Sequence, residues 1–398
     1  MAAVSGMPGL RSVLRDNRRW WIVLALLFGA WAWWSPEWSI NPGGARNAAI
    51  QLAATMLFGL VVLCASPSPK RLALALVVGG AFQAVIVIGQ LMAQSSLGLR
   101  FLGEFVIRPN QRGLSLLFAG TDELMRPYGL TVHPNVVGGY LTISLLALTG
   151  WLSAPPRRWL FRLLYFALAG LIFWALLGTF SRGAWLGLLF ASAILILLWL
   201  RRGVAPIRPR WSYLIPVYVL LVLVGIGFLL RYSEYVWARA GTGAEVTELR
   251  SLNDRRIFAE AALQFVGKYP VTGVGIGNYV YQLVGWLRQS PYYGLRSQHV
   301  HNLPLLITAE LGLTGGLLWA GLLSLGAGIA WRNCRDPFAI GVGVGAAALF
   351  AIGLFDHYPW TIMHFAMLFW ACLGVAMRTP TLVDAQLASA AAMPEDGQ

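Results

Sequence analysis

The sequence predicts an all-α fold, a polytopic transmembrane bundle of about ten, and at most twelve, helices. Of its 398 residues, 58% are hydrophobic and only 12% are charged, and the mean hydropathy is +0.64. A soluble domain carries roughly 25% charged residues, so this chain has too few charges to cover a water-facing surface. Its apolar residues also form runs close to the length of about 20 residues that crosses a bilayer. We therefore expect residues 1–398 to form a single integral membrane domain.

The individual spans follow from these apolar runs. Ten are predicted, at residues 20–35, 47–65, 72–93, 134–153, 161–179, 183–200, 211–230, 303–330, 338–355 and 361–377. The first follows the arginines of segment Arg11–Arg19, which resembles the charged start of a signal peptide. Because Pro36–Trp38 follows it in place of a small-residue cleavage site, we expect the first span to be uncleaved.

Basic residues indicate which way the spans run. The formal net charge is +14, from 30 Lys and Arg against 16 Asp and Glu. With ten spans, the short basic segments all fall on one side: the N-terminal segment, Lys70–Arg71, Arg157–Arg162, Arg201–Arg210, Arg332–Arg335 and Arg378. Such loops stay in the cytoplasm, so we expect both termini there, with tail 379–398 disordered. This distribution argues against nucleic-acid binding as the reason for the positive charge.

Two long segments, 94–133 and 231–302, then lie outside the membrane, and loops of this length usually have a role. The second is predicted to hold an amphipathic helix. Ser251 and Asp254 have the spacing of a capping box, and Pro270 ends the helix. Its apolar face consists of residues that repeat with helical period: Ile257, Phe258, Ala261, Ala262, Phe265 and Val266. We expect this helix to lie on the membrane surface or against the bundle.

Three arginines are candidates for function, because charged groups at membrane depth are costly and usually have a role. Arg182 lies at the outer junction of two spans, where an arginine either anchors the interface or faces a pocket. Arg255 aligns with Phe258 and leans toward the buried face of the outer helix. Arg256 is spaced to pair with Glu260 on the surface. We therefore favour Arg255 over Arg256 as the functional arginine.

Two histidines, His299 and His301, precede Asn302 at the outer start of a span. A single histidine there is more often structural, but two in three residues favour proton chemistry, because imidazole titrates near neutrality. His301 is the first choice as a base and His299 the second. Glu310 lies nine residues after His301, about 13 Å along a helix. We expect it to pack or to accept hydrogen bonds, without contacting His301.

Other site classes find little support in the sequence. Gly273–Gly277 resembles a phosphate loop but lacks a βαβ unit, so a tight turn packed on the bundle is expected. Cys64, Cys334 and Cys372 show no disulfide framework or metal-ligand spacing. The spans hold no carboxylate pair, no Asp/Glu/His cluster suggests a metal, and no broken helices in repeated halves suggest an ion-coupled carrier.

Four stretches together resemble a known family, over most of the chain and most strongly from Arg126 to Gly316. They are Arg126-Pro127-Tyr128-Gly129 with His133-Pro134-Asn135; Ser181-Arg182-Gly183-Ala184-Trp185-Leu186; Arg255 through Pro270 into Gly273–Tyr279; and His301-Asn302 followed after nine residues by Gly312-Leu313-Thr314-Gly315. In this order, with the long outer loop, they resemble the O-antigen ligase and O-antigen polymerase superfamily of bacterial membrane glycosyltransferases.

The resemblance implies an inverting enzyme of the bacterial inner membrane that works on its outer face. Its donor would be a glycan on undecaprenyl pyrophosphate, with neither metal nor nucleotide cofactor. Arg182 and Arg255 would hold the pyrophosphate, and His301 would activate the acceptor hydroxyl, on lipid A core or another glycan. Substrate contacts are also expected from Arg126, Asn135, Arg256, His299 and Asn302.

Several functions stay open at this point. The His-Asn and Gly-x-x-Gly spacing favours a ligase, ahead of a repeat-unit polymerase and of another glycan transferase. A flippase or exporter of the lipid-linked glycan would share the outer arginines but would not need a histidine base. A scaffold for a synthesis complex would tolerate replacement of Arg182 and His301.

Overall fold

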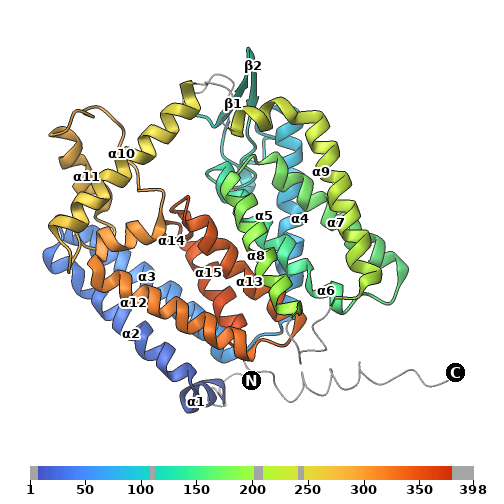
Figure 1. Cartoon of the computed structure of the whole chain (residues 1–398), viewed down its shortest axis with the longest axis horizontal. Helices are drawn as coiled ribbons and strands as arrows, with labels where there is room; N and C mark the ends of the chain where they lie inside the picture. The colour runs from blue at the N-terminus through green and yellow to red at the C-terminus, as the bar shows by residue number, and fades with distance from the viewer. Residues whose placement is uncertain (1–7, 108–112, 201–208, 241–245, 379–398) are drawn as a thin grey trace.

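The all-α fold predicted from the sequence is confirmed by the computed structural model, which describes residues 8–107, 113–200, 209–240 and 246–378 (Figure 1). Within these residues, strands occur only in the antiparallel hairpin of β1 (Leu116–Ala119) and β2 (Asp122–Met125). This hairpin, in the first outer segment, was not predicted. The tail 379–398 and basic residues 201–208 lie outside the described residues.

Each of the ten predicted spans corresponds to a helix. These are α2 (Arg18–Trp34), α3 (Pro42–Ala65), α4 (Pro69–Ala93), α5 (Pro134–Leu148) with α6 (Gly150–Ser153), α7 (Trp159–Gly178), α8 (Arg182–Leu200), α9 (Trp211–Ala240), α12 (Leu303–Asn333), α13 (Pro337–Gly353) and α15 (Met363–Ala376). The remaining elements are α1 (Pro8–Arg15), η1 (Ser35–Trp38), η2 (Arg100–Leu102), α10 (Val246–Lys268), α11 (Tyr279–Arg288) and α14 (Tyr358–Thr361). In the described part of the chain, seven helices are long and apolar enough to cross a membrane, while α13 and α15 are shorter apolar helices.

Local sequence sets where several helices begin. α3, α4, α5 and α13 start at a proline, which fixes φ near its helical value and has no N–H to leave unpaired. Asn41 caps α3 by accepting a hydrogen bond from the Gly44 N–H at 3.0 Å. Asp336 caps α13 in the same way through the Ala339 N–H at 2.7 Å. These caps satisfy N–H groups that the first turn of a helix leaves free.

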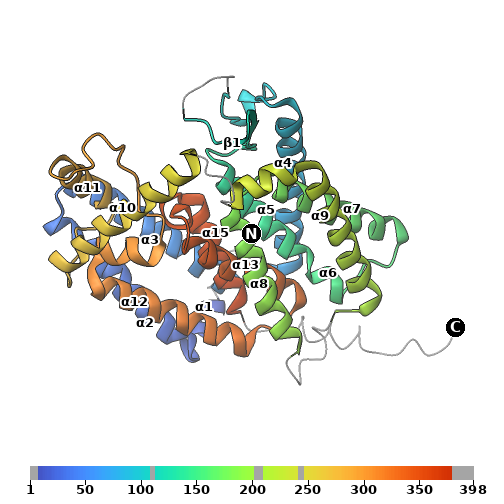
Figure 2. The ribbon, with the colours of Figure 1, turned by 45° about the horizontal axis from the view of Figure 1, so that its top comes forward.

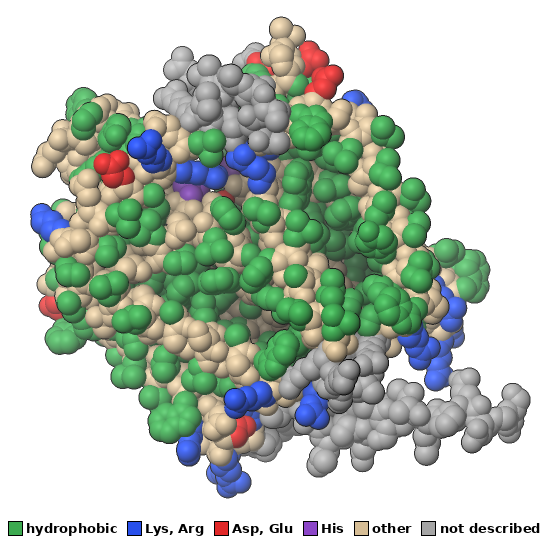
Figure 3. Space-filling model, viewed as in Figure 1, with side chains coloured by type: hydrophobic (Ala, Val, Ile, Leu, Met, Phe, Trp, Pro, Cys, Tyr) green, Lys and Arg blue, Asp and Glu red, His purple; other side chains and the backbone are tan. Residues whose placement is uncertain are grey.

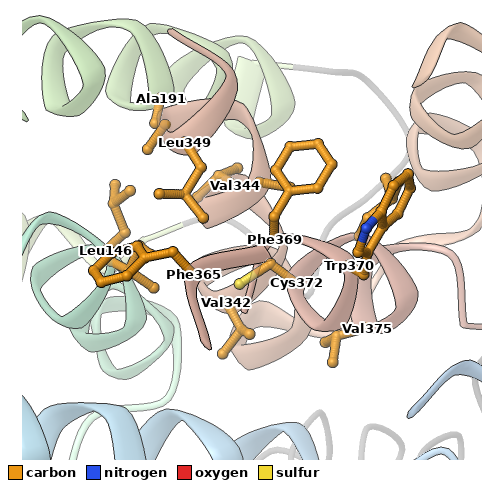
Figure 4. Close-up of a cluster of buried hydrophobic side chains, with 14 of the residues drawn as sticks. Leu146, Ala191, Val342, Val344, Leu349, Phe365, Phe369, Trp370, Cys372 and Val375 are labelled. Atoms are coloured by element: carbon orange, nitrogen blue, oxygen red, sulfur yellow. The ribbon is translucent and has the colours of Figure 1, made fainter. Parts of the chain in front are cut away.

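The central helix of the bundle is α13, which packs against α4, α5, α8 and α15. Almost all of its residues are buried, and its many glycines and alanines let neighbouring helices approach closely, as in other membrane bundles. Figure 4 shows the packing around it: Leu349 faces Ala191 of α8, and Phe365, Phe369 and Cys372 of α15 lie on its other side. This core fixes α5, α8, α13 and α15 relative to one another.

Two boundaries of the outer region differ from the prediction. α9 continues to Ala240, ten residues past the predicted end of the span at 230, with one non-helical residue at Tyr232. α10 begins at Val246, so the capping box at Ser251 was wrong, since Ser251 lies inside the helix. The reason is the same in both places: the residues concerned contain neither glycine nor proline, so polar side chains do not end the helix.

The amphipathic helix itself is confirmed as α10, which ends at Lys268, just before Pro270. Its apolar face is buried against α11, Val300 and the first turns of α12. The Tyr279 hydroxyl of α11 donates to the Phe258 carbonyl oxygen at 2.6 Å. Of the two predicted positions, the helix therefore lies against the bundle.

A break in α12 at Gly312, where φ is +70° and ψ −178°, departs from the expectation of unbroken helices. The break frees backbone groups, and the turn Gly273–Gly277 pairs with them. The N–H groups of Val274 and Gly275 donate to the carbonyl oxygens of Ala309 and Glu310 at 3.0 and 2.7 Å. The expected tight turn is thus confirmed as packed on the bundle. A broken helix is stable at membrane depth only when its free backbone groups find such partners.

Replacing Gly312 by alanine is therefore expected to destabilise the protein. The residue has a left-handed φ, and an added Cβ would collide with the Val271 carbonyl group. Such strain costs of order 1–3 kcal/mol. The measurement is thermal unfolding of the detergent-solubilised protein. Gly267→Ala is the control, because a Cβ there meets nothing within 4 Å and alanine favours a helix over glycine by up to about 1 kcal/mol. Equal melting temperatures of the two variants would contradict the account of the break.

Candidate active site

Titratable side chains gather at one end of the bundle, here called the site end, where α7, α9 and α13 finish and α5, α8 and α12 begin (Figure 1). α10 and the hairpin of β1 and β2 lie over this end (Figure 2). In Figure 3, a histidine is visible between basic side chains at the surface of the same end. The fold thus places the termini of several distant segments around one region.

Three histidines and one carboxylate form what we call the histidine group: His299, His301, Asp356 and His357. The ring of His357 lies between the other two, with centroids 4.8 Å from His299 and 5.2 Å from His301. The nearest ligand atoms of His301, Asp356 and His357 all lie within 4.8 Å of one another. Nδ1 of His301 is buried and has no hydrogen-bond partner among the described residues. This nitrogen therefore has hydrogen-bonding capacity that no described residue uses.

Asp356 is held in place by hydrogen bonds from two neighbouring residues. The Asn135 amide donates to Asp356 Oδ2 at 2.8 Å, and the His357 backbone N–H donates to Oδ1 at 2.8 Å. Arg126 in turn donates from Nη2 to Asn135 Oδ1 at 2.7 Å. Through these contacts the start of α5 and the turn after α13 fix the carboxylate beside the imidazoles.

Burial controls the protonation of the group. It lowers the pKa of His299 and of His357 to about 4 in each case, and it also lowers the pKa of His301. Burial would raise the pKa of Asp356, but His357, His301 and the Asn135 hydrogen bond together hold that pKa below its usual range. At neutral pH the group therefore consists of neutral imidazoles beside an ionised carboxylate, which is the state a general base requires.

The arginines of the outer loop differ in their surroundings. Arg255 is half-buried, and its charge acts on both His301 and His357. Arg256 is exposed, so the predicted orientation of the two side chains agrees with the structure. Arg239, at the end of α9, was not predicted as a site residue, although its charge acts on His133 beside Asn135. No sequence motif includes Arg239, so nothing in the sequence predicted it.

Arg182 lies at the same end, at the first turn of α8. Its Nη1 donates to the Arg239 carbonyl oxygen at 2.9 Å, and Arg239 Nε donates to the Phe180 carbonyl oxygen at 3.4 Å. These contacts tie α9 to the turn between α7 and α8. The side chain of Arg182 is only half-buried, so it remains near the surface of the site.

Two further predicted residues are engaged by protein groups. Arg126 is 2% exposed and donates from Nε to the Thr179 carbonyl oxygen at 2.8 Å, in addition to its bond with Asn135. Asn302 caps α12 by accepting from the Leu305 N–H at 2.9 Å, and it donates to the Leu354 carbonyl oxygen at 3.2 Å. Both residues brace the segments that carry the histidine group.

Besides Arg239, three members of the site were missed: His133, Asp356 and His357. His133 caps α5, its Nδ1 accepting from the Asn135 N–H at 3.1 Å. Asp356 follows His301 by 55 residues, so no local spacing connects the two. The expectation that no Asp/Glu/His cluster exists was wrong, because folding brings together three groups of the kind that hold a metal ion. The nearby charge of Arg255 makes the surroundings unfavourable for a cation.

Residues 167–320 match the family model described as O-antigen ligase. This segment is an O-antigen ligase-family domain. For this segment, the match bears out the superfamily expected from the motifs. No curated protein matched the chain.

The O-antigen ligase-family segment runs from α7 into α12, and so it contains Arg182, Arg255 and His301. Asp356 and Asn135 lie outside it, on the turn after α13 and at the start of α5. The C-terminal flank of the matched segment therefore completes the histidine group, and the N-terminal flank supplies the amide that holds its carboxylate.

Proposed function

We propose that the protein transfers a glycan from undecaprenyl pyrophosphate to an acceptor hydroxyl, at the outer face of the bacterial inner membrane. The observation that carries the proposal is the arrangement at the site end, where Arg255 lies beside a group of neutral imidazoles with an ionised aspartate. The acceptor is lipid A core or a similar glycan, which makes the protein a ligase. Both termini are cytoplasmic in this arrangement, following the positive charge of the short loops.

In the proposed reaction, the acceptor oxygen attacks the anomeric carbon of the donor sugar. The bond between that carbon and the pyrophosphate oxygen breaks, and the electron pair leaves with undecaprenyl pyrophosphate. The configuration at the anomeric carbon inverts. Arg255 and Arg182 neutralise the growing negative charge, which guanidinium groups do through bidentate hydrogen bonds without losing their proton. Such charge stabilisation is strong where water is excluded.

His301 takes the proton of the acceptor hydroxyl in this mechanism. Its unpartnered Nδ1 supports this choice over His299. Asp356 stabilises the imidazolium that forms. Arg126, Asn135 and Asn302 hold the group in position, while Arg256 and His299 extend the surface toward the substrates.

Analysis of the envelope glycan in a deletion strain tests the ligase assignment. If the deleted protein is a ligase, the strain accumulates long glycan chains that are not attached to the acceptor. If it is a repeat-unit polymerase, the acceptor carries single repeat units. Transfer from a purified lipid-linked donor tests catalysis itself. Turnover in detergent without an ion gradient supports an enzyme, and absence of any transfer alongside transport in vesicles contradicts it and favours a flippase.

The pH dependence of transfer follows from the lowered pKa values of the histidines. A base acts in its neutral form, so activity is lost as the pH falls through the pKa of the folded site. An ordinary histidine would lose half its activity at about pH 6.5. We expect the midpoint of the acid limb to lie below pH 6.5, because burial lowers the pKa of His301 by disfavouring the imidazolium. A measured midpoint at or above pH 6.5 would contradict a buried neutral base.

A further inference from the structure

We propose that a small cavity beside the histidine group binds the sugar ring of the acceptor that receives the glycan. The cavity has a volume of about 180 Å³ and lies between α3, the Ile276–Gly277 turn, the start of α12 and the α14–α15 junction. The inference rests on the proposed glycan transfer and adds a subsite to it. The polar residues that line the cavity are Gln51, Thr55, His299, Glu310 and Thr361, together with the indole of Trp360.

The cavity adjoins the histidine group through His299 and Thr361. Two of its lining residues contact His357 directly: the ring of His299 lies 4.8 Å from that of His357, and Thr361 Oγ1 lies 2.8 Å from His357 Nδ1. His357 in turn contacts His301. A sugar seated in the cavity therefore lies against His299 and Thr361, the two lining residues that connect to His301 through His357.

The chemistry of the lining suits a neutral, hydroxyl-bearing ring. Glu310 is 2% exposed, and its Oε1 accepts from the Tyr279 N–H at 3.4 Å. The Gly277 backbone and the Trp360 side chain also hydrogen-bond this carboxyl group. Since a carboxylate has about four acceptor sites, about one site remains for a sugar hydroxyl. The Trp360 indole and the side chains of Leu52 and Met363 supply apolar surface for the C–H face of a ring. A few placed polar groups on an apolar wall are typical of small-ligand sites.

Charge separates this cavity from the proposed pyrophosphate site. None of its described lining residues is a lysine or arginine. The lining therefore offers a diphosphate no cationic partner, whereas Arg255 does. The two substrates are therefore expected to reach the histidine group past different elements, the donor past α10 and the acceptor past α3.

Size and position limit the occupant further. Pockets for drug-sized ligands measure about 300–1,000 Å³, so 180 Å³ has room for a single sugar ring. Gln51 and Met363 are the most exposed lining residues, which places the opening between α3 and the start of α15. An opening on the side of the bundle suits an acceptor that is itself anchored in the membrane.

The test obstructs the cavity from its exposed rim. Gln51→Trp is compared with Ala53→Trp, which places the same bulk on an exposed position of α3 that does not line the cavity. The probes are the lipid-linked donor and the acceptor glycolipid extracted from a deletion strain. We expect Gln51→Trp to raise the KM for the acceptor at least about tenfold with the KM for the donor unchanged, and Ala53→Trp to change neither. An unchanged acceptor KM in Gln51→Trp overturns the subsite.

Photocrosslinking gives a second measurement if Gln51→Trp fails to fold. A benzophenone amino acid at position 51 is expected to capture the radiolabelled acceptor glycolipid, and the same probe at position 53 is not. Capture of the donor, or of neither lipid by a protein that still transfers glycan, overturns the subsite. Failure of the wild-type protein to transfer any glycan would instead overturn the proposed function, so the two failures are distinguishable.

Discussion

Replacing Arg255 by alanine is expected to reduce glycan transfer by about 10²–10³-fold, the loss found when one group that stabilises transition-state charge is removed. Arg255 is half-buried and its charge reaches His301 and His357. Arg255→Lys should restore only part of the activity, since an ammonium group lacks the planar fork that binds phosphate oxygens in pairs. The measurement is the rate of transfer from the lipid-linked donor, normalised to protein in the membrane.

Arg256→Ala is the matched control for this prediction. It removes the same charge one residue further along α10, from a side chain that is exposed. We expect less than about a threefold change, because an exposed charge acts weakly across water. Equal losses in the two variants would point to the net charge of the helix as the cause. A larger loss in Arg256→Ala would reverse the assignment.

The second large effect is expected at Asp356. Asp356→Asn keeps the size of the side chain but removes the charge that stabilises a protonated imidazole, and we expect kcat to fall by about 10²–10⁴-fold, the range of general-base catalysis. The KM for the donor should change little, because the arginines are untouched. Asp356 acts through the histidines and is therefore a positioning residue.

The pH profile distinguishes this role from a structural one. Asp356 raises the pKa of His301 and of His357 against the larger opposite effect of burial. Losing the charge lowers these pKa values further, so the acid limb of the residual activity should move to lower pH. Glu104→Gln is the control: Glu104 is also buried, and it accepts from the N–H groups of Leu97 and Leu99 at 2.7 and 2.6 Å. Glu104→Gln should reduce the stability of the protein and leave the acid limb in place. An acid limb that does not move in Asp356→Asn would contradict the role of the Asp356 carboxylate.

Local sequence patterns were sufficient to predict the positions of the apolar helices. A bilayer requires long apolar segments. The lengths of the apolar runs therefore predicted ten segments, and the structure has a helix at each of them. The buried face of α10 was also readable, because Ile257, Phe258 and Ala261 repeat with the period of a helix. Helix ends were less certain: α10 begins before Ser251, since a capping residue competes with a neighbouring sequence that favours helix on both sides.

Motif order marked Arg255 and His301, but it left their partners unknown. The sequence by itself determined that this protein is a helical membrane protein with basic and imidazole groups near one end of its spans. Only the tertiary structure decided that Asp356, Asn135 and His357 join His301, and that Glu310 faces a cavity behind them. The physical reason is distance along the chain: span length and helical period are local properties, whereas a site built where α5, α12 and α13 meet depends on how separate helices pack.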